Sequence, residues 1–225
     1  MSVPLRKNER LVSAAYEVME CMRVLHKSGS NLVAEALQKN EFIEWEHYPP
    51  DDVYDPESRA QYYFHAHPVS EVRFSDYGHF HTFLRFDEEA GGSRGSGNPQ
   101  DPNSGGICHI VGISMTREGL PERLFTVNRW VTGESWRPAA EITETLDRFE
   151  IDLSSPSWPL NRWLSAMVVL YRAEITVLLK ERDERIASWE AAHPGTDVLE
   201  DRALEITSAL EISLDRKIKA LQATA

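Results

Sequence analysis

The first forty residues carry the pattern of amphipathic helices. Apolar residues recur at intervals of three and four positions between residues 9 and 25, namely Leu11, Ala15, Val18, Met22 and Leu25. Side chains at this spacing share one face of an α-helix, so the segment predicts a helix with a buried stripe. Gly29 ends the pattern, and residues 31–38 predict a second, shorter helix.

Between residues 61 and 136 the apolar period changes from about 3.6 residues to about two, and β-branched and aromatic residues become frequent. This pattern is typical of β-strands, in which successive side chains point to opposite faces. We expect a central antiparallel sheet of about four strands, over residues 62–67, 78–86, 107–115 and 123–131. The preceding segment, 46–52, predicts a loop because it contains adjacent prolines and several acids.

Beyond residue 136 the helical period returns. Pro159 begins a predicted helix whose apolar stripe runs to about residue 192, and a second helix is expected from Thr196 to about residue 222. Two long helices joined by a short break predict an antiparallel hairpin. Helices at both ends of an antiparallel sheet make an α+β fold. We expect a single domain over residues 1–225, with N-terminal helices in 1–45, the sheet in 60–136 and the hairpin in 159–222.

Four of the eight histidines lie within seventeen positions, as the pairs His65 and His67 and His79 and His81. In a β-strand, residues i and i+2 point to the same face, so each pair presents two imidazoles side by side. Two such pairs on adjacent strands can converge on one ion, and neutral imidazole is the commonest metal ligand. The spacing therefore predicts a metal site, with surface or hydrogen-bonded histidines as the alternative.

The expected ligands are His65, His67, His79 and His81. Two further residues are expected as substitutes or as supporting partners: His109, on the face of the third strand that carries Val111 and Ile113, and Glu71, in the turn between the two pairs. A set of nitrogen ligands, with or without a carboxylate, suits Zn, Fe(II), Cu or Ni, whereas Ca and Mg prefer oxygen. Three protein ligands with an open coordination position indicate a catalytic site, whereas four protein ligands indicate a structural site. The sequence does not show how many of these residues bind the ion.

The segment around the first histidine pair resembles the first metal-binding motif of the cupin superfamily. The likeness covers His65-x-His67, Glu71 and the closing Gly78, but Arg59 stands where the motif begins with glycine. The second cupin motif is represented only in part. The resemblance implies His65, His67, Glu71 and His109 as ligands and leaves His79 and His81 in the wall of the pocket.

Over most of its length the chain resembles a family of uncharacterised bacterial proteins. The segments that carry this likeness are YYFHAHP (62–68), GHFHTFLR (78–85), HIVGIS (109–114) and LFTVNRWVTGE (124–134). The resemblance implies a family identity but no activity.

The predicted fourth strand presents one face of polar and aromatic side chains. Its members are Thr126, Asn128, Trp130 and Thr132. We expect Asn128 to bind substrate beside the metal, together with Arg85 and Arg129, whose guanidinium groups can clamp a carboxylate or a phosphate. Ion pairing of both arginines with some of the 36 acidic side chains is the alternative.

Composition narrows the choice of partners and of location. The formal net charge of −12 argues against nucleic acid and against an anionic membrane surface. No apolar run reaches the roughly 18 to 20 residues of a membrane span, and the first residues lack the apolar core of a signal peptide, so we expect a cytoplasmic protein. Cys21 and Cys108 lie in unlike segments and predict buried apolar residues. The mixed charges of residues 182–185 predict a solvated helix face.

The leading hypothesis is a metal-dependent enzyme that acts on a small organic substrate. An oxidoreductase with iron or copper is favoured over a hydrolase, and zinc stays an alternative, because a histidine-rich site without cysteine suits all three metals. The second hypothesis is a metal- or haem-binding sensor or carrier without turnover, with the C-terminal helices as a homodimer surface. The third is an interaction protein whose histidines are ordinary buried polar residues.

Overall fold

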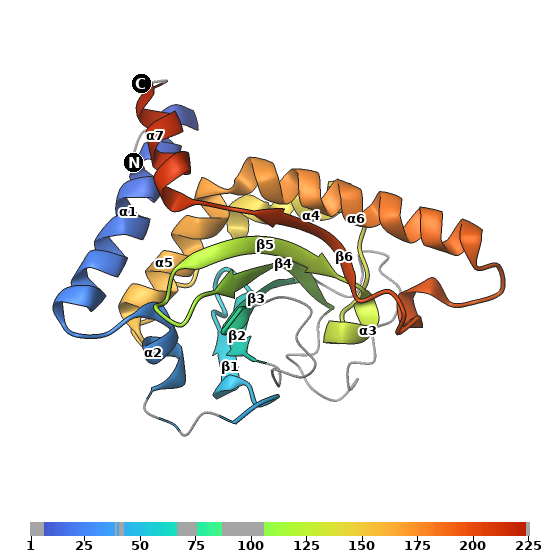
Figure 1. Ribbon diagram of the computed structural model, residues 1–225, viewed down its shortest axis with the longest axis horizontal. Coiled ribbons are helices and arrows are strands. Elements are labelled where there is room, and N and C mark those ends of the chain that lie inside the picture. The colour runs from blue at the N-terminus through green and yellow to red at the C-terminus, as the bar shows by residue number, and fades with distance from the viewer. Residues whose placement is uncertain (1–6, 39, 41–42, 67–75, 87–105, 224–225) are drawn as a thin grey trace.

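The structure, a computed structural model, describes residues 7–38, 40, 43–66, 76–86 and 106–223. In this part of the chain, six strands form one sheet whose spatial order follows the sequence. The strands are β1 (Tyr48–Tyr54), β2 (Ala60–His65), β3 (Gly78–Arg85), β4 (Ile107–Met115), β5 (Pro121–Val127) and β6 (Ile206–Glu211). Neighbouring strands are antiparallel throughout, so the sheet is a meander with β1 and β6 at its edges (Figure 1).

Helices cover one side of this sheet. The helices are α1 (Lys7–Lys27), α2 (Leu32–Leu37), α3 (Arg129–Thr132), α4 (Ala139–Thr145), α5 (Trp158–Leu170), α6 (Arg172–Ala192) and α7 (Leu214–Ala223), with short 3-10 turns η3 (Leu146–Arg148) and η4 (Val198–Glu200). In Figure 1, α4, α5 and α6 lie together on this side, and α1 packs along α5.

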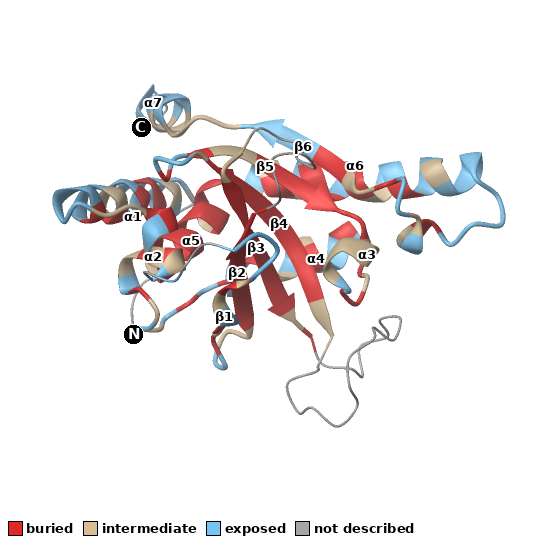
Figure 2. Cartoon of the chain, turned by 60° about the horizontal axis from the view of Figure 1, so that its bottom comes forward, coloured by how far each residue is buried: buried red, intermediate tan, exposed pale blue. Residues whose placement is uncertain are grey.

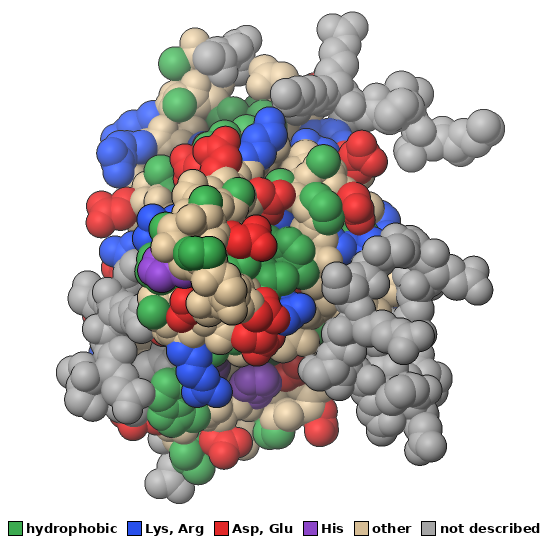
Figure 3. All heavy atoms as spheres, turned by 90° about the vertical axis from the view of Figure 1, so that its right-hand side faces the viewer, with side chains coloured by type: hydrophobic (Ala, Val, Ile, Leu, Met, Phe, Trp, Pro, Cys, Tyr) green, Lys and Arg blue, Asp and Glu red, His purple; other side chains and the backbone are tan. Residues whose placement is uncertain are grey.

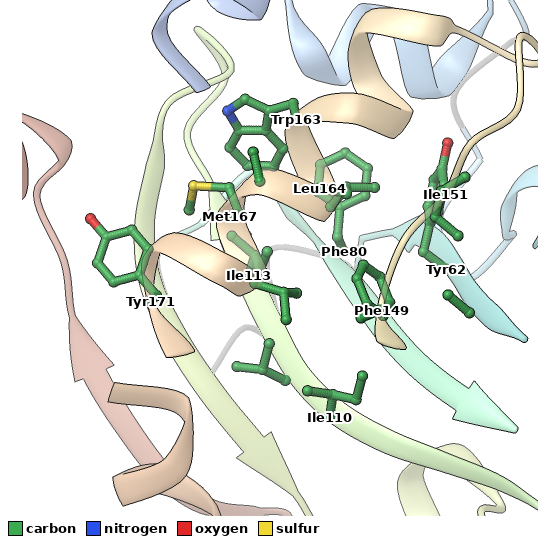
Figure 4. Packing of buried hydrophobic residues seen from close by; sticks show 14 of the residues in the cluster. Tyr62, Phe80, Ile110, Ile113, Phe149, Ile151, Trp163, Leu164, Met167 and Tyr171 are labelled. Carbon is green, nitrogen blue, oxygen red and sulfur yellow. The ribbon is translucent and has the colours of Figure 1, made fainter. Parts of the chain in front are cut away.

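The main core lies between the sheet and α5. Phe80 and Ile113 point from the strands toward α5, which carries Trp163 and Met167, and Ile110 belongs to the same buried cluster (Figure 4). Trp163 is completely buried, and its ring centroid lies 6.1 Å from that of Phe80. Figure 2 shows β2, β3 and β4 buried along almost their whole length. Every second side chain of these strands points into this core, so the side chains between them lie on the opposite face of the sheet.

The α+β class, the antiparallel sheet and the N-terminal helix are confirmed. Helix α1 contains the predicted segment, and Gly29 beyond it has a φ of 72°, a left-handed conformation that glycine adopts without steric cost. The second predicted helix is α2, whose first turn is capped by the Asn31 side chain. Three of the four predicted strands agree with β2, β3 and β4 to within two residues at each end. Both cysteines are buried.

Two of the local predictions around the sheet are wrong. Residues 48–54, expected within and after a loop, form the edge strand β1, where prolines are tolerated because one side of an edge strand needs no ladder hydrogen bonds. The predicted fourth strand ends early, since β5 stops at Val127 and residues 129–132 form α3. The expected alternating face of residues 126–132 therefore does not exist.

The C-terminal region also differs in detail from the predicted hairpin. The first predicted helix is present as α5 and α6, which are separated at Tyr171. The second is replaced by η4, strand β6 and the short helix α7. Strand β6 pairs with β5 and lies beneath α6, so this segment completes the sheet instead of the hairpin.

The charged surface agrees only in part with the sequence. Acidic and basic side chains are interspersed on the face at the free end of α6 (Figure 3). However, Arg182 is not solvated as expected, because its side chain is buried over the Trp136 ring and donates to the Arg137 carbonyl at 2.6 Å. Within the described residues, no helix has the length and apolar composition that a bilayer crossing requires.

Candidate metal centre

The histidines lie on the face of the sheet opposite the helices. Strands β2 and β3 pair so that Tyr63 is opposite His81 and His65 is opposite His79. Directly opposed residues of antiparallel strands point to the same face, with Cβ atoms about 4.5 to 5.5 Å apart. The register alone therefore brings three imidazoles and one phenol ring together.

Three of these side chains form a compact, buried cluster. One ring nitrogen from each of His65, His79 and His81 lies within 4.8 Å of the other two. The side chains are 8%, 5% and 1% exposed, respectively. The Nε2 atoms of His65 and His79 are 2.8 Å apart, whereas two nitrogens on one tetrahedral zinc ion are about 3.3 Å apart. A shift of about half an ångström is enough for both rings to share an ion, so the cluster can hold a metal.

The rings of His79 and His81 each make a second contact, through Nδ1. The Nδ1 atom of His79 lies 3.2 Å from Oδ2 of Asp76, and both side chains are 7% exposed. The Nδ1 atom of His81 lies 2.9 Å from Nε2 of His109. The Asp76 contact leaves Nε2 of His79 facing the cluster, where Nε2 of His65 is 2.8 Å away.

His109 reaches this face because of a β-bulge. Thr82 pairs with Val111 but Phe83 pairs with His109, so Ile110 is an extra residue on β4. His109 and Val111 therefore lie on opposite faces, which corrects the expectation that they share one. His109 is not one of the three clustered histidines, and it contacts the cluster through His81.

A buried carboxyl group anchors the bulge. The backbone N–H of His109 donates to Oε2 of Glu134 at 2.6 Å, and Glu134 is 1% exposed. Burial raises the pKa of Glu134 to about 7, although Arg182 and the hydrogen bond from His109 act in the opposite direction. Burial lowers the pKa of His109 to about 3, and the positive charge of Arg182 adds to this effect. The His109 ring is therefore neutral at physiological pH.

Aromatic rings enclose the cluster along the sheet. Phe125 of β5 lies across Gly112, where an added Cβ would be only 2.3 Å from the ring atom Cζ. From there the Phe125 ring meets His79 edge to face, at a centroid distance of 5.2 Å, and His81 at 5.7 Å. On the other side, the Tyr63 ring lies 5.3 Å from His65 and 5.2 Å from His81. Gly112 is thus required for the close approach of one wall of the site.

One residue at the site, His47, was not expected there. Its ring stacks on Tyr63 at 3.7 Å with an interplanar angle of 9°, and its Nδ1 atom lies 3.0 Å from Oδ1 of Asp52. The centroid of the His65 ring is 5.8 Å away. His47 directly precedes β1. Its segment was predicted to be a loop, so the sequence did not predict on which face of the sheet the His47 ring lies. The only available signal was the aromatic and apolar spacing of Tyr48 and Val53, which the intervening prolines obscure.

The remaining candidate residues fall into two groups. His67 and Glu71 lie outside the described residues. Arg85 shares the histidine face of β3, donates to Oε1 of Gln61 at 2.9 and 2.6 Å and lies over the Tyr54 ring at 4.7 Å.

Asn128 and Arg129 lie at the end of β5, each with its own partners. Asn128 is completely buried, caps α3 with its side-chain oxygen and donates to the Val198 carbonyl at 2.8 Å. Arg129 pairs with Glu200 at 2.8 Å and with Asp197 at 3.5 Å. These contacts join α3 to η4, and they make use of the hydrogen-bonding groups that we expected to bind substrate.

Comparisons with known proteins give a family but no relative with an assigned activity. No curated protein and no solved structure matched the chain. No link to the cupin superfamily was found, and the single meander sheet differs from the double-sheet barrel that such a link implies. The family model for the Domain of unknown function (DUF6969) matches residues 12–212, and the chain therefore belongs to this family.

Proposed function

We propose that this protein is a metal-dependent enzyme whose ion is bound by His65, His79 and His81. The observation that carries the proposal is the convergence of three buried ring nitrogens, from two adjacent strands, within 4.8 Å. Neutral imidazole nitrogens suit Zn, Fe(II), Cu and Ni and disfavour the oxygen-seeking Ca and Mg. An ion at this position would be held by three protein ligands on a rigid part of the sheet.

Three ligands support catalysis more than a structural role. A structural zinc site is usually closed by four protein ligands, whereas a catalytic site keeps a position for water or substrate. The aromatic side chains of Tyr63, Phe83 and Phe125 surround the cluster and suit a small organic substrate. We favour an oxidoreductase over a hydrolase, since a set of histidines without cysteine or carboxylate also suits iron and copper.

Among the three polar residues considered for substrate binding, we retain Arg85. It lies on the same face of β3 as His79 and His81, four residues beyond the latter. Within the part of the chain that the structure describes, the Arg85 guanidinium pairs with no carboxylate, since it donates to the uncharged amide oxygen of Gln61. A carboxylate or phosphate on the substrate could supply that negative charge.

The alternative function is a metal-binding sensor or carrier without turnover. The burial of all three histidines favours it, since an ion that must exchange ligands needs an accessible position. The two functions differ in the response of the bound ion to small anions. Azide should alter the visible spectrum of a Co(II)-loaded enzyme, whereas a closed binding site should not respond.

The test of the metal centre is the metal content of the protein produced without a histidine tag. We expect about one transition-metal ion per chain, and loss of this ion in His65→Ala, His79→Ala and His81→Ala. His193→Ala is the matched control, because His193 is exposed at the end of α6. The proposal is refuted if the wild-type protein binds neither Zn²⁺ nor Co²⁺ above background, or if the three variants bind as the control does.

A further inference from the structure

We infer that Asp76 and His109 are positioning residues of this centre, which hold His79 and His81 by Nδ1 so that both ligands present Nε2 to the ion. The inference rests on the proposed metal centre and adds to it the orientation of each ring. It also assigns different supports to the two ligands, a carboxylate for one and a neutral imidazole for the other.

The first support is the contact between Asp76 and His79. A carboxylate can only accept a hydrogen bond, so Oδ2 of Asp76, 3.2 Å from Nδ1 of His79, places the ring proton on Nδ1. The lone pair of the neutral ring is then on Nε2. Both side chains are 7% exposed, so water competes little for this bond. Carboxylate, histidine and metal in this order form a common arrangement that orients the ring and raises its basicity.

The position of His65 provides a separate indication. Its Nε2 atom lies 2.8 Å from Nε2 of His79, on the side of the ring away from Nδ1. The nitrogen of His79 that faces another ligand is thus the one that Asp76 leaves without a proton. A metal ion between these two nitrogens would replace the direct contact between the rings.

The second support is the contact between His109 and His81. Of the two nitrogens that are 2.9 Å apart, one must donate and the other accept. For His81 to bind an ion through Nε2, its Nδ1 carries the proton and Nε2 of His109 accepts it. The bulge at Ile110 and the bond from the His109 backbone to Glu134 hold the acceptor in this place. A nitrogen that accepts from His81 does not act as a ligand, which separates the role of His109 from that of the three ligands.

The test of Asp76 compares two aspartates that each contact a histidine through Nδ1. Asp76→Asn and Asp52→Asn make the same substitution, but Asp52 contacts His47, which is not one of the three ligands. We expect Asp76→Asn to weaken Zn²⁺ and Co²⁺ binding about 10-fold, and Asp76→Ala, which removes the acceptor, up to about 100-fold. The Asp52→Asn control should bind within about twofold of the wild type.

The test of His109 uses a rescue. His109→Phe keeps an aromatic ring but removes the acceptor, and we expect about 10- to 100-fold weaker metal binding. His109→Gln keeps an acceptor oxygen, so it should recover part of the lost affinity. Circular dichroism of the metal-free proteins identifies any variant that has lost its fold, in which case the milder Asn or Gln variant decides the outcome.

The proton NMR spectrum of the Co(II)-loaded protein provides a readout that a merely structural role would not change. Histidine ligands bound through Nε2 should give strongly shifted Nδ1–H signals that disappear in D2O. Exchange of one signal should accelerate in Asp76→Ala, and of a different one in His109→Phe.

The outcomes separate the two levels of the proposal. If the wild type binds no ion, the proposed function fails and this inference fails with it. If the wild type and Asp52→Asn bind the ion, and Asp76→Ala and His109→Phe bind it equally well with unchanged ring-proton signals, only the positioning roles are overturned.

Discussion

Glu134 lies in an environment unlike that of a free glutamate side chain. It is buried beneath the histidine face and accepts from the His109 backbone at 2.6 Å. Burial raises its pKa from a usual value of 4.5 to about 7. The folded protein therefore holds this proton more tightly than the unfolded chain does. The stabilisation from the protonated group is complete below the unfolded pKa and is lost as the pH rises toward the folded pKa.

We predict that Glu134→Gln removes this pH dependence. Glutamine keeps an oxygen that can accept from the His109 N–H but does not ionise. Relative to the wild type, the free energy of unfolding of the variant should rise by about 2 to 3 kcal/mol between about pH 5 and about pH 8. Urea denaturation of both proteins across this range measures the difference. Parallel curves for the two proteins would show that Glu134 ionises normally in the folded state.

Residue-scale features were predictable only where they follow from strand alternation. His65, His79 and His81 were expected on one face because each is two positions from a neighbour on the same strand or opposite it on the next. His109 reaches that face through a bulge that simple alternation cannot reveal. His47 reaches it by stacking on Tyr63, a contact made through the fold.

At the scale of elements, β6 shows why a helical period can mislead. Ala203, Ile206, Leu210 and Leu214 are spaced by three and four residues, which predicted a helix. In the structure only the segment from Leu214 onward is helical, while residues 206–211 pair with β5. The signal for a strand was weak, because the buried Thr207 and Ser208 are polar whereas the exposed Leu210 is apolar. The secondary structure of such a segment depends more on pairing with a neighbouring strand than on the period of its own apolar residues.

A small group of buried hydroxyls joins β5, β6 and α6. Oγ1 of Thr126 lies 2.7 Å from the hydroxyl oxygens of both Thr207 and Ser208. The Ser208 hydroxyl also lies 2.8 Å from the Leu178 carbonyl, to which it donates. Ser208 thus connects the edge strand to the helix that covers it.

We predict that Ser208→Ala lowers the free energy of unfolding by about 1 to 3 kcal/mol, because it leaves buried partners without a hydrogen bond. Ser188→Ala makes the same change on the exposed face of α6, where the hydroxyl bonds only to the Glu184 carbonyl. This control should stay within about 0.5 kcal/mol of the wild type. Chemical denaturation measures both variants, and an equal effect of the two would contradict the proposed link through Ser208.

At the scale of the whole molecule, the sheet has two unlike faces. The apolar one packs on α5, and the other carries the histidines and their aromatic neighbours. The sequence places apolar side chains on both faces of β2 and β3, and both strands are buried along nearly their whole length. It could not indicate two further strands at the edges of the sheet, since β1 contains prolines and β6 has a helical spacing. The formation of an edge strand depends more on hydrogen bonding to the neighbouring strand than on the composition of the segment itself.

The location of the three histidines on neighbouring strands gives a prediction for the whole fold. An ion that binds the folded chain, and not the unfolded one, stabilises it by about 2.7 kcal/mol when its free concentration is 100 times the dissociation constant. For a chain of this size the melting temperature should rise by about 5 to 10 °C.

Calorimetry of the chelator-treated protein, before and after addition of Zn²⁺, measures this shift. His81→Ala should melt at the same temperature with and without the ion, because one of the three ligands is missing. His193→Ala should respond as the wild type does, since its ring is exposed at the end of α6. A shift of equal size in His81→Ala would mean that Zn²⁺ stabilises the protein from another site, and the histidine face would then have no part in it.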